Sequence, residues 1–217
     1  MQLKYIWALT LYFASAAAGV CQVAVPVLDM TKALPCTDTR RTGSASGGGV
    51  SVEGQPPPSL PFSLRLVDIS PNSFRWYDRI VYEVELENNG TTAVRIPWGT
   101  ICDVHPEDPQ LVIACIFLTL SGDPAGRSLG FTSIHGSRSD EKTTRVVAPG
   151  ERVRIRIGAL ASGATTDDPV RKKLETQSTI TITVIANFAF LQGADRDYVQ
   201  LHSGNSLSVE VLKWKQP

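Results

Sequence analysis

The sequence lacks an excess of charge of either sign. Its 217 residues include 21 lysines and arginines and 21 aspartates and glutamates, so the formal net charge is zero. Non-specific binding to nucleic acid needs a basic excess or a basic stripe, and the balanced composition argues against that class of partner. Hydrophobic residues make up 42% of the chain, too many for a disordered polypeptide. Its four cysteines are too few for a disulfide scaffold.

Long hydrophobic runs are scarce, and the main one lies at the N-terminus. Met1–Ala18 combines one cation with an apolar run that ends in three alanines. This pattern is typical of a secretory signal peptide cleaved before Gly19. The run from Tyr5 to Val20 has 16 residues, whereas a membrane-spanning helix needs about 20, so a membrane anchor is the weaker interpretation. We expect export to the periplasm or the cell exterior, with no membrane-spanning segment in the mature chain.

A lipid anchor at Cys21 is a further alternative, because this cysteine follows the apolar run. A lipoprotein signal resembles Leu-x-Gly/Ala-Cys, but Val20 stands where the small residue is needed. Lipidation is therefore disfavoured.

Catalytic and metal-binding motifs are also missing. The sequence contains no Gly-x-Ser-x-Gly, His-Glu-x-x-His, Gly-x-x-x-x-Gly-Lys or Gly-x-Gly-x-x-Gly motif. The three histidines, His105, His135 and His202, fall in or near expected loops. The segment Cys102–Asp108 contains three acidic residues close to His105. It can be interpreted as a cation site or as a solvated turn, and we favour the turn. We predict no catalytic residues, no metal and no cofactor, although a triad assembled from distant residues stays an alternative.

The region that follows the predicted signal peptide resembles a tail. Thr42–Gly49 has the glycine- and serine-rich composition of a flexible linker, and Gln55–Pro61 is a proline-rich spacer. We therefore divide the chain into a signal peptide (1–18), a flexible tail (19–61) and one domain (62–217).

Alternation of apolar and polar residues dominates from residue 62 onward and predicts strands. Leu111–Leu118 is apolar on both faces, which predicts a central strand covered on both sides. Asn88-Asn89-Gly90 predicts a tight hairpin turn, and Thr166–Gln177 predicts one short helix. The fold class is all-β, an antiparallel immunoglobulin-like sandwich of 7–9 strands. The expected strands are Phe62–Leu66, Ile80–Glu87, Val94–Trp98, Leu111–Leu118, Ser128–Ile134, Val153–Ile157, Thr179–Leu191 and Leu207–Val211.

Two stretches carry a family resemblance. Tyr82–Trp98 (YEVELENNGTTAVRIPW) and Ala148–Val153 (APGERV) resemble bacterial extracytoplasmic immunoglobulin-like domains, which pair a V-x-N-x-G hairpin with a later PGE turn. They are also similar to the proteinase-inhibitor sandwich domain first described in bacilli. The resemblance implies a fold and a bacterial source, but no activity. Antibody-type domains carry a cysteine pair on two strands that lack cysteine here, so an antibody-type core is excluded.

Two of the expected strands carry opposite charges on their polar faces. In the immunoglobulin-like order they are the second and fifth strands, which are antiparallel neighbours in one sheet. Side chains opposite each other lie about 5 Å apart, so we expect a ladder of glutamate–arginine pairs that sets the strand register. The alternative is an acidic or basic docking stripe. The charge ladder consists of Glu83, Glu85, Glu87, Arg152, Arg154 and Arg156.

The four cysteines allow three pairings. Proximity in sequence favours one disulfide between Cys21 and Cys36 and another between Cys102 and Cys115. A metal site is the alternative, but no Cys-x-x-Cys motif is present, and disulfides suit an exported protein.

Three aromatic residues cluster before the second expected strand. If exposed, Phe74, Trp76 and Tyr77 would form a binding platform for carbohydrate or peptide; if buried, they would cap the end of the sandwich. Capping is the favoured interpretation.

These features together predict an exported, non-enzymatic protein that acts as a binding or structural module. Its expected partner is another protein or an envelope polysaccharide, and the sequence leaves its oligomeric state open. Loops at one end of such a sandwich carry recognition, which makes Gly99–Pro109 and Ser121–Ser128 the candidate interaction segments. Two alternatives stay open: a proteinase inhibitor with a rigid protruding loop, and an enzyme without a sequence signature.

Overall fold

The computed structural model describes residues 24–31, 61–105, 107–121, 128–161, 178–191 and 197–213. Within these ranges the chain is nearly all β, as predicted, with one turn of 3-10 helix, η2 (Glu141–Thr143). The strands are β1 (Val27–Asp29), β2 (Phe62–Ser70), β3 (Ser73–Phe74), β4 (Arg79–Asn88), β5 (Val94–Pro97), β6 (Leu111–Leu120), β7 (Ser128–Ser137), β8 (Thr144–Val147), β9 (Arg152–Leu160), β10 (Thr179–Phe190), β11 (Asp197–His202) and β12 (Leu207–Val211).

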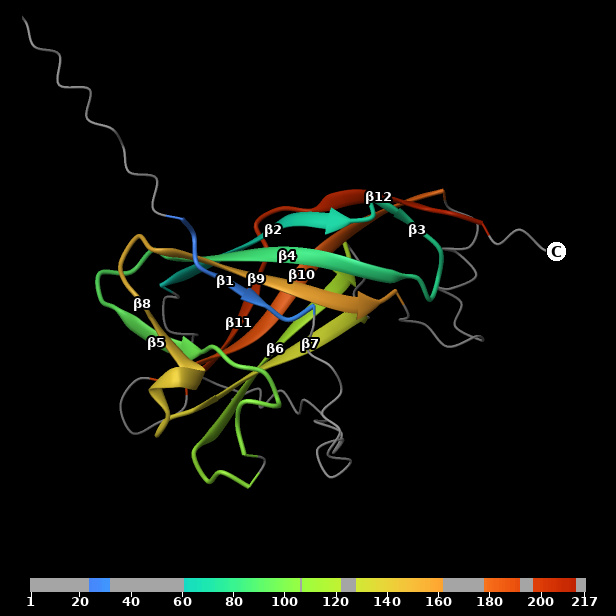
Figure 1. Ribbon diagram of the computed structural model, residues 1–217. Coiled ribbons are helices and arrows are strands. Elements are labelled where there is room, and N and C mark those ends of the chain that lie inside the picture. The colour runs from blue at the N-terminus through green and yellow to red at the C-terminus, as the bar shows by residue number, and fades with distance from the viewer. Residues whose placement is uncertain are drawn as a thin grey trace, which may run out of the picture.

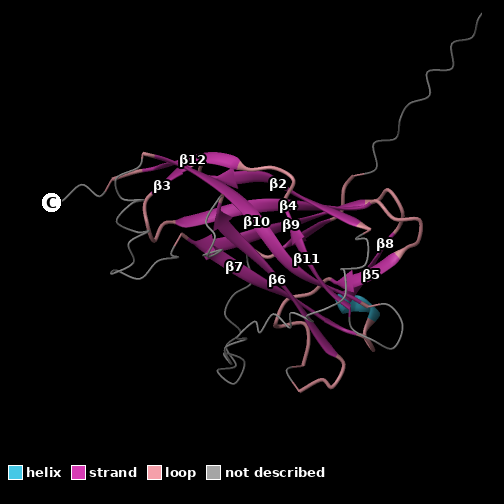
Figure 2. Ribbon diagram, turned by 180° about the vertical axis from the view of Figure 1, so that it is seen from behind, coloured by secondary structure: helices cyan, strands magenta, loops and turns pink. Residues whose placement is uncertain are grey.

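The strands form two large sheets and one small one. The first sheet has the order β1-β9-β4-β2, and the second has the order β3-β12-β10-β6-β7, with β11 paired to β10. Figure 1 shows the first sheet in front of the second, and Figure 2 shows the same layers from behind. The third sheet, β5-β8, lies with η2 at the end of the molecule opposite β3 (Figure 2).

The core lies between the two large sheets. The alternating pattern of β4 buries every second side chain: Tyr82, Val84 and Leu86 are 0% exposed. They belong to the same core cluster as Ile116 on β6 and Val184 on β10. Burial of each such aliphatic side chain stabilises the fold by about 1.5–3 kcal/mol, so the alternation read from the sequence is what holds the sheets together.

Part of the predicted tail belongs to the folded domain. β1 pairs in parallel with β9, and the Met30 N–H donates a 2.7 Å hydrogen bond to the carbonyl of Arg156. Met30 is 5% exposed and belongs to the core cluster. The prediction that all of residues 19–61 lie outside the domain is therefore wrong for residues 24–31. Three residues of strand are too few for a visible alternation, which is why the sequence pattern missed them.

The strand number and pairing also differ from the expectation of 7–9 antiparallel strands. The described residues form twelve strands, and two of the pairings, β1–β9 and β3–β12, are parallel. The strands that were not expected are β1, β3, β8 and β11, of which three have four residues or fewer.

The predicted hairpin at Asn88-Asn89-Gly90 is wrong. β4 pairs with β2 and β9, whereas β5 pairs with β8, so the strands on either side of this turn belong to different sheets. Asn88 itself is 0% exposed, and its side-chain amide donates to the carbonyls of Thr92 and Val147, both at 2.9 Å. The amide therefore ties the end of β4 to β8, a role that a turn-propensity argument does not consider.

β6 is covered on one face rather than two. Val112, Ala114 and Ile116 are buried, while Ile113 and Phe117 on the other face are only half-buried. Phe117 stacks on Phe131 of β7, which is 59% exposed. The correction follows from the layer arrangement, because no third layer among the described residues covers this face.

Several expectations fall outside the described residues. They are the signal peptide (1–18), the helix at Thr166–Gln177, Cys21 and Cys36, and most of Ser121–Ser128.

The contribution of β1 to stability is testable at Met30. Met30→Ala is expected to lower the free energy of unfolding by about 2 kcal/mol, because the side chain is buried in the core cluster. The matched control is Val27→Ala in the same strand, which is 51% exposed and should change stability by less than about 0.5 kcal/mol. Guanidinium unfolding of the full chain measures both. Equal, small effects would show that β1 adds nothing to the fold.

Candidate functional site

The charge ladder lies on the outer face of the first sheet, in the arrangement that the sequence predicts. β4 and β9 are antiparallel neighbours, and their register places glutamates opposite arginines in three successive pairs. The pairs are Glu83–Arg156, Glu85–Arg154 and Glu87–Arg152.

The strongest contacts of the ladder converge on Arg154. Its Nε donates to Glu85 at 2.9 Å and its Nη1 donates to Glu83 at 3.1 Å. These hydrogen bonds, led by the one to Glu85, raise the pKa of Arg154. Arg152 adds contacts of 3.3 Å to Glu87 and 4.0 Å to Glu85. Because the charges neutralise one another across the strands, the ladder suits register and solvation better than docking.

The aromatic cluster is not a platform. Phe74 is 0% exposed and Trp76 is 7% exposed, so both cap the end of the core, as the favoured interpretation had it. Tyr77 alone is exposed, at 51%, and has a positive φ of 70°. The alternative, a binding platform that includes Phe74 and Trp76, is therefore wrong, because a buried ring offers no face to a ligand.

The candidate interaction loop Gly99–Pro109 closes on itself through its carboxylates. Asp103 accepts hydrogen bonds from the N–H and hydroxyl of Thr100, at 2.6 and 2.7 Å. Asp108 accepts a 2.7 Å hydrogen bond from the Gln110 N–H. The pKa of Asp108 is lowered, first by a hydrogen bond from the Ser137 side chain and second by the hydrogen bond from Gln110. These contacts are those of a turn. In the described part of the chain, no group of three or more His, Cys, Asp or Glu side chains is arranged to hold a metal ion.

The start of this loop is attached to His135 of β7. Gly99 and His135 exchange two backbone hydrogen bonds of 2.8 and 2.9 Å. The imidazole is 5% exposed, and its Nε2 lies 2.8 Å from the hydroxyl of Ser133. Burial lowers the pKa of His135 and outweighs the charge of Asp103, which acts in the opposite direction. The ring is therefore neutral at pH 7. Of the other two histidines, His105 lies in the loop and His202 ends β11.

The cysteine pairing differs from the expectation. Cys115 is a free thiol on β6, and burial raises its pKa. The predicted Cys102–Cys115 disulfide is therefore wrong. Cys102 lies in the loop before β6, whereas Cys115 is four residues into the strand, about 13 Å along it. Cys102 is disulfide-bonded, but not to Cys115.

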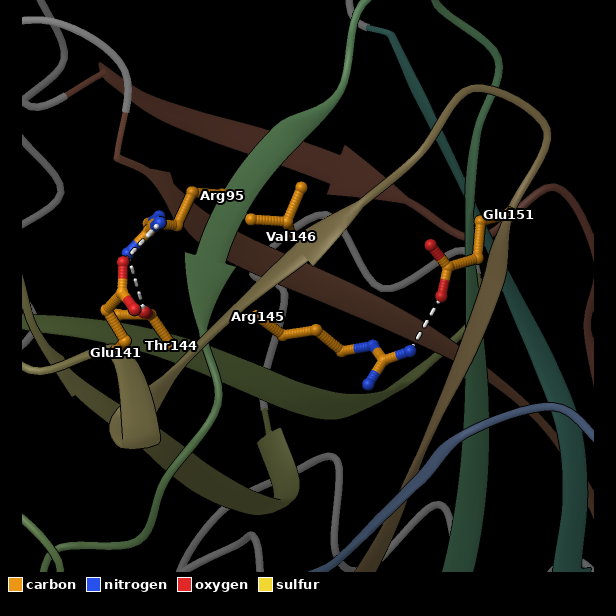
Figure 3. Close-up of a pocket in the computed structure, with 6 residues that line it drawn as sticks. All are labelled: Arg95, Glu141, Thr144, Arg145, Val146 and Glu151. Carbon is orange, nitrogen blue, oxygen red and sulfur yellow. Dashed lines mark hydrogen bonds and ion pairs between the residues drawn. The ribbon is translucent and has the colours of Figure 1, made fainter.

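A pocket of about 350 Å³ opens beside the β5–β8 sheet. Figure 3 shows Arg95 directed toward Glu141 and Arg145 directed toward Glu151, with Val146 between the two pairs. The six lining residues are Arg95, Glu141, Thr144, Arg145, Val146 and Glu151.

The two ion pairs of the pocket differ in how firmly they are held. Arg145 Nη2 lies 2.7 Å from Glu151 Oε1, and the guanidinium carbon lies 5.5 Å from the centre of the Trp98 ring. Arg95 Nη2 lies 3.2 Å from Glu141, whose side chain is 85% exposed. The first pair is therefore less than one-third exposed and packed against Trp98, while the second ends in a solvent-exposed carboxylate.

Glu151 is fixed by its turn. Its second oxygen accepts a 2.8 Å hydrogen bond from the Ala148 N–H, within the turn that contains Gly150 at a φ of 74°. Burial alone would raise the pKa of Glu151, but the hydrogen bonds from Ala148 and Arg145 outweigh it and the pKa is lowered. The carboxylate is therefore ionised at neutral pH and cannot serve as a proton donor there.

The sequence pattern did not single out these pocket residues. Arg95 and Arg145 lie 50 residues apart in four-residue strands, where the alternation is too short to indicate a partner. The one available signal was the PGE turn, which contains Glu151, and it was used only for the fold.

Comparison with known proteins adds little. No protein-family model matches the chain, and no curated protein matches it. Among solved structures, it is similar to the alkylpurine DNA glycosylase AlkC of Pseudomonas fluorescens at 10% identity and a TM-score of 0.30, covering 66% of this chain and 30% of that one. It is similar to the putative ApaA protein of Bordetella pertussis at 13% identity and a TM-score of 0.32, covering 71% and 98%.

A third similar structure is the sporulation control protein Spo0M of Bacillus subtilis, at 10% identity and a TM-score of 0.32, covering 66% of this chain and 49% of that one. The chain thus spans less than a third of the glycosylase and about half of Spo0M. Likenesses this weak carry no argument about fold or function. In the ranges that the structure describes, no helix has the length and apolar character needed to span a membrane.

The ladder predicts a measurable coupling between Glu85 and Arg154. In a double-mutant cycle with Glu85→Gln and Arg154→Gln, we expect a coupling energy of about 1 kcal/mol, because the Glu85 side chain is only 8% exposed. For Glu87 and Arg152, whose side chains are 31% and 53% exposed, we expect about 0.3 kcal/mol. Urea unfolding measures both cycles. Coupling energies of zero in both would remove the ladder from the forces that set the register.

Burial of His135 predicts lower stability in acid. Its pKa is lower in the folded chain than the value of about 6.5 in the unfolded chain, so protons bind preferentially to the unfolded state. The stability that depends on a neutral His135 is fully present above about pH 6.5. It is lost as the pH falls through the lowered pKa that His135 has in the folded chain. We expect His135→Gln to lose less thermal stability than the unchanged protein between pH 7.5 and pH 5. Parallel pH profiles for the two proteins would contradict this role.

Proposed function

We propose that this chain is an exported, non-enzymatic protein whose immunoglobulin-like domain acts as a binding or structural module outside the cytoplasm. The pocket beside the β5–β8 sheet is the observation that carries the proposal. Its polar groups are two guanidiniums, two carboxylates and one hydroxyl. A guanidinium stays protonated and cannot act as a base, so this set favours recognition of a ligand over bond cleavage.

The strand order supports the immunoglobulin-like part of the proposal. One sheet contains β2, β4 and β9, and the other contains β12, β10, β6 and β7. Immunoglobulin-like domains distribute strands A, B and E to one sheet and strands G, F, C and C′ to the other, in the same chain order. The strands β1, β3 and β11 and the separate β5–β8 sheet are additions to that plan.

The cysteine chemistry supports export. Disulfides persist in oxidising compartments, and Cys102 is disulfide-bonded. Together with the signal-peptide pattern of Met1–Ala18, this favours the periplasm or the cell exterior.

An enzyme is the second candidate, because of one contact. The Ser133 hydroxyl lies 2.8 Å from Nε2 of a neutral His135, which is the pairing of a nucleophile with its base. This contact joins two residues of the same strand, and the half-buried Ser133 faces the same side of the sheet as Cys115. The pair therefore gives a defined test of the enzyme alternative.

Three measurements on the exported protein test the proposal. The intact mass is expected to lack residues 1–18. A fluorophosphonate probe is expected to leave Ser133 unlabelled. The immobilised protein is expected to retain a partner saturably from the native envelope, whereas heat-denatured protein is the control that should retain none. Labelling of Ser133 that is lost in His135→Gln would favour the enzyme, and retention of no partner would contradict a binding module.

A further inference from the structure

We infer that the pocket beside the β5–β8 sheet binds a carboxylate of an acidic peptide segment, and that Glu141 occupies the same guanidinium while the ligand is absent. This inference rests on the proposed binding function and names its ligand class. Arg95 is the anchoring residue, Glu141 is the internal competitor, and Arg145 fixes the far side of the pocket (Figure 3).

Arg95 is suited to exchange its partner. Its guanidinium contacts Glu141 at 3.2 Å and the Thr144 hydroxyl at 3.4 Å, both near the limit of a hydrogen bond. The Glu141 side chain is 85% exposed and belongs to a helix of three residues. An exposed pair of this kind shifts an equilibrium by only about 1.4- to 5-fold, so an incoming carboxylate with better geometry can replace it.

Arg95 also has the geometry for a stronger contact. A guanidinium presents two parallel N–H donors to one carboxylate, and a bidentate pair is stronger than a single contact. Glu141 uses only one of these donors, Nη2. A ligand carboxylate is free of the backbone constraint that limits Glu141, so it can take both.

Arg145 does not exchange in this way. Its contact with Glu151 is 2.7 Å long, both side chains are less than one-third exposed, and its guanidinium covers the Trp98 ring. Its Nε is buried and has no hydrogen-bond partner among the described residues. Arg145 therefore stays paired with Glu151, and Arg95 is the guanidinium of the pocket whose partner can exchange.

The walls of the pocket favour peptide over polysaccharide. Sugars stack on exposed aromatic rings, but none of the six residues that line the pocket is aromatic, and the Trp98 ring lies under Arg145. Val146 lies between the two ion pairs and is 48% exposed, so its aliphatic side chain can contact one apolar side chain of a ligand (Figure 3). An acidic residue beside an apolar one fits both features.

Fluorescence anisotropy of labelled poly-L-glutamate tests the inference on the mature full chain at about 0.1 M salt, where the screening length is about 10 Å. Arg95→Gln is expected to weaken binding at least tenfold, the loss of a charge-assisted bidentate contact. Glu141→Gln is expected to strengthen binding by about 1.4- to 5-fold, because it removes the competitor. A gain in affinity cannot result from misfolding, so this variant keeps the test valid if Arg95→Gln is unstable.

Matched controls separate a specific site from general charge attraction. Arg79→Gln alters the opposite end of β4, about 30 Å from Asn88 and beyond the screening length, and should leave binding unchanged. Glu210→Gln removes one exposed negative charge on β12, as Glu141→Gln does on η2, and should also have no effect. Equal effects of Arg79→Gln and Arg95→Gln, or of Glu210→Gln and Glu141→Gln, would overturn the inference.

A competing polymer identifies the ligand class. Polygalacturonate is expected to displace poly-L-glutamate poorly; tighter, Arg95-dependent binding of polygalacturonate would replace the peptide by an acidic polysaccharide. If neither polymer binds through Arg95 while the envelope partner is still retained, the ligand class is wrong and the binding function stands. If no partner is retained either, the proposed function itself fails.

Discussion

The antiparallel pairing of β4 with β9 is the constraint on which the rest of the structure depends. It runs over nine residue pairs without a register shift, from Arg79 opposite Leu160 to Glu87 opposite Arg152. A slip by one residue would turn the buried side chains of β4 to solvent and its glutamates into the core. Both β2 and β1 are added to the outer edges of this pair, so the whole first sheet takes its register from it. The charge ladder acts in the same direction, because only one register places each glutamate opposite an arginine.

Sequence reasoning succeeded where one physical signal extends over a long segment. The alternation of β4 and β9 predicts their buried faces, the expected strand order makes the two strands neighbours, and the charges between the apolar residues predict the ladder that joins them. It failed where the signal is short. β1 and β3 have two or three residues and are held by partners distant in sequence, so no local pattern marks them. The cysteine prediction failed because nearness in sequence says nothing about the extended geometry of β6, which carries Cys115 away from the loop.

The pocket was unpredictable for a related reason. Its two arginines lie on neighbouring strands only because β5 leaves β4 and pairs with β8, which contradicts the expected hairpin. Asn88 determines this departure: its buried side chain binds the carbonyl of Val147 and accepts a 2.9 Å hydrogen bond from the Gly90 N–H. A turn motif indicates that the chain changes direction, but the partner of the next strand depends on tertiary hydrogen bonds that composition does not encode. The wrong hairpin prediction and the failure to predict the pocket therefore have the same cause.

The same turn explains why the two ion pairs of the pocket behave differently. Gly150 N–H donates to the Asn88 carbonyl at 2.7 Å, and Asn88 N–H donates to the Glu151 carbonyl at 3.1 Å, so the turn that carries Glu151 is attached to the end of β4. Arg145 is therefore held in place through Glu151, because the turn that carries Glu151 is attached to the β4–β9 pair. Arg95 is instead paired with a solvent-exposed side chain on a single helical turn. A ligand carboxylate at Arg95 would replace the contacts with Glu141 and the Thr144 hydroxyl and leave the Arg145–Glu151 pair in place, so binding needs little reorganisation of the protein.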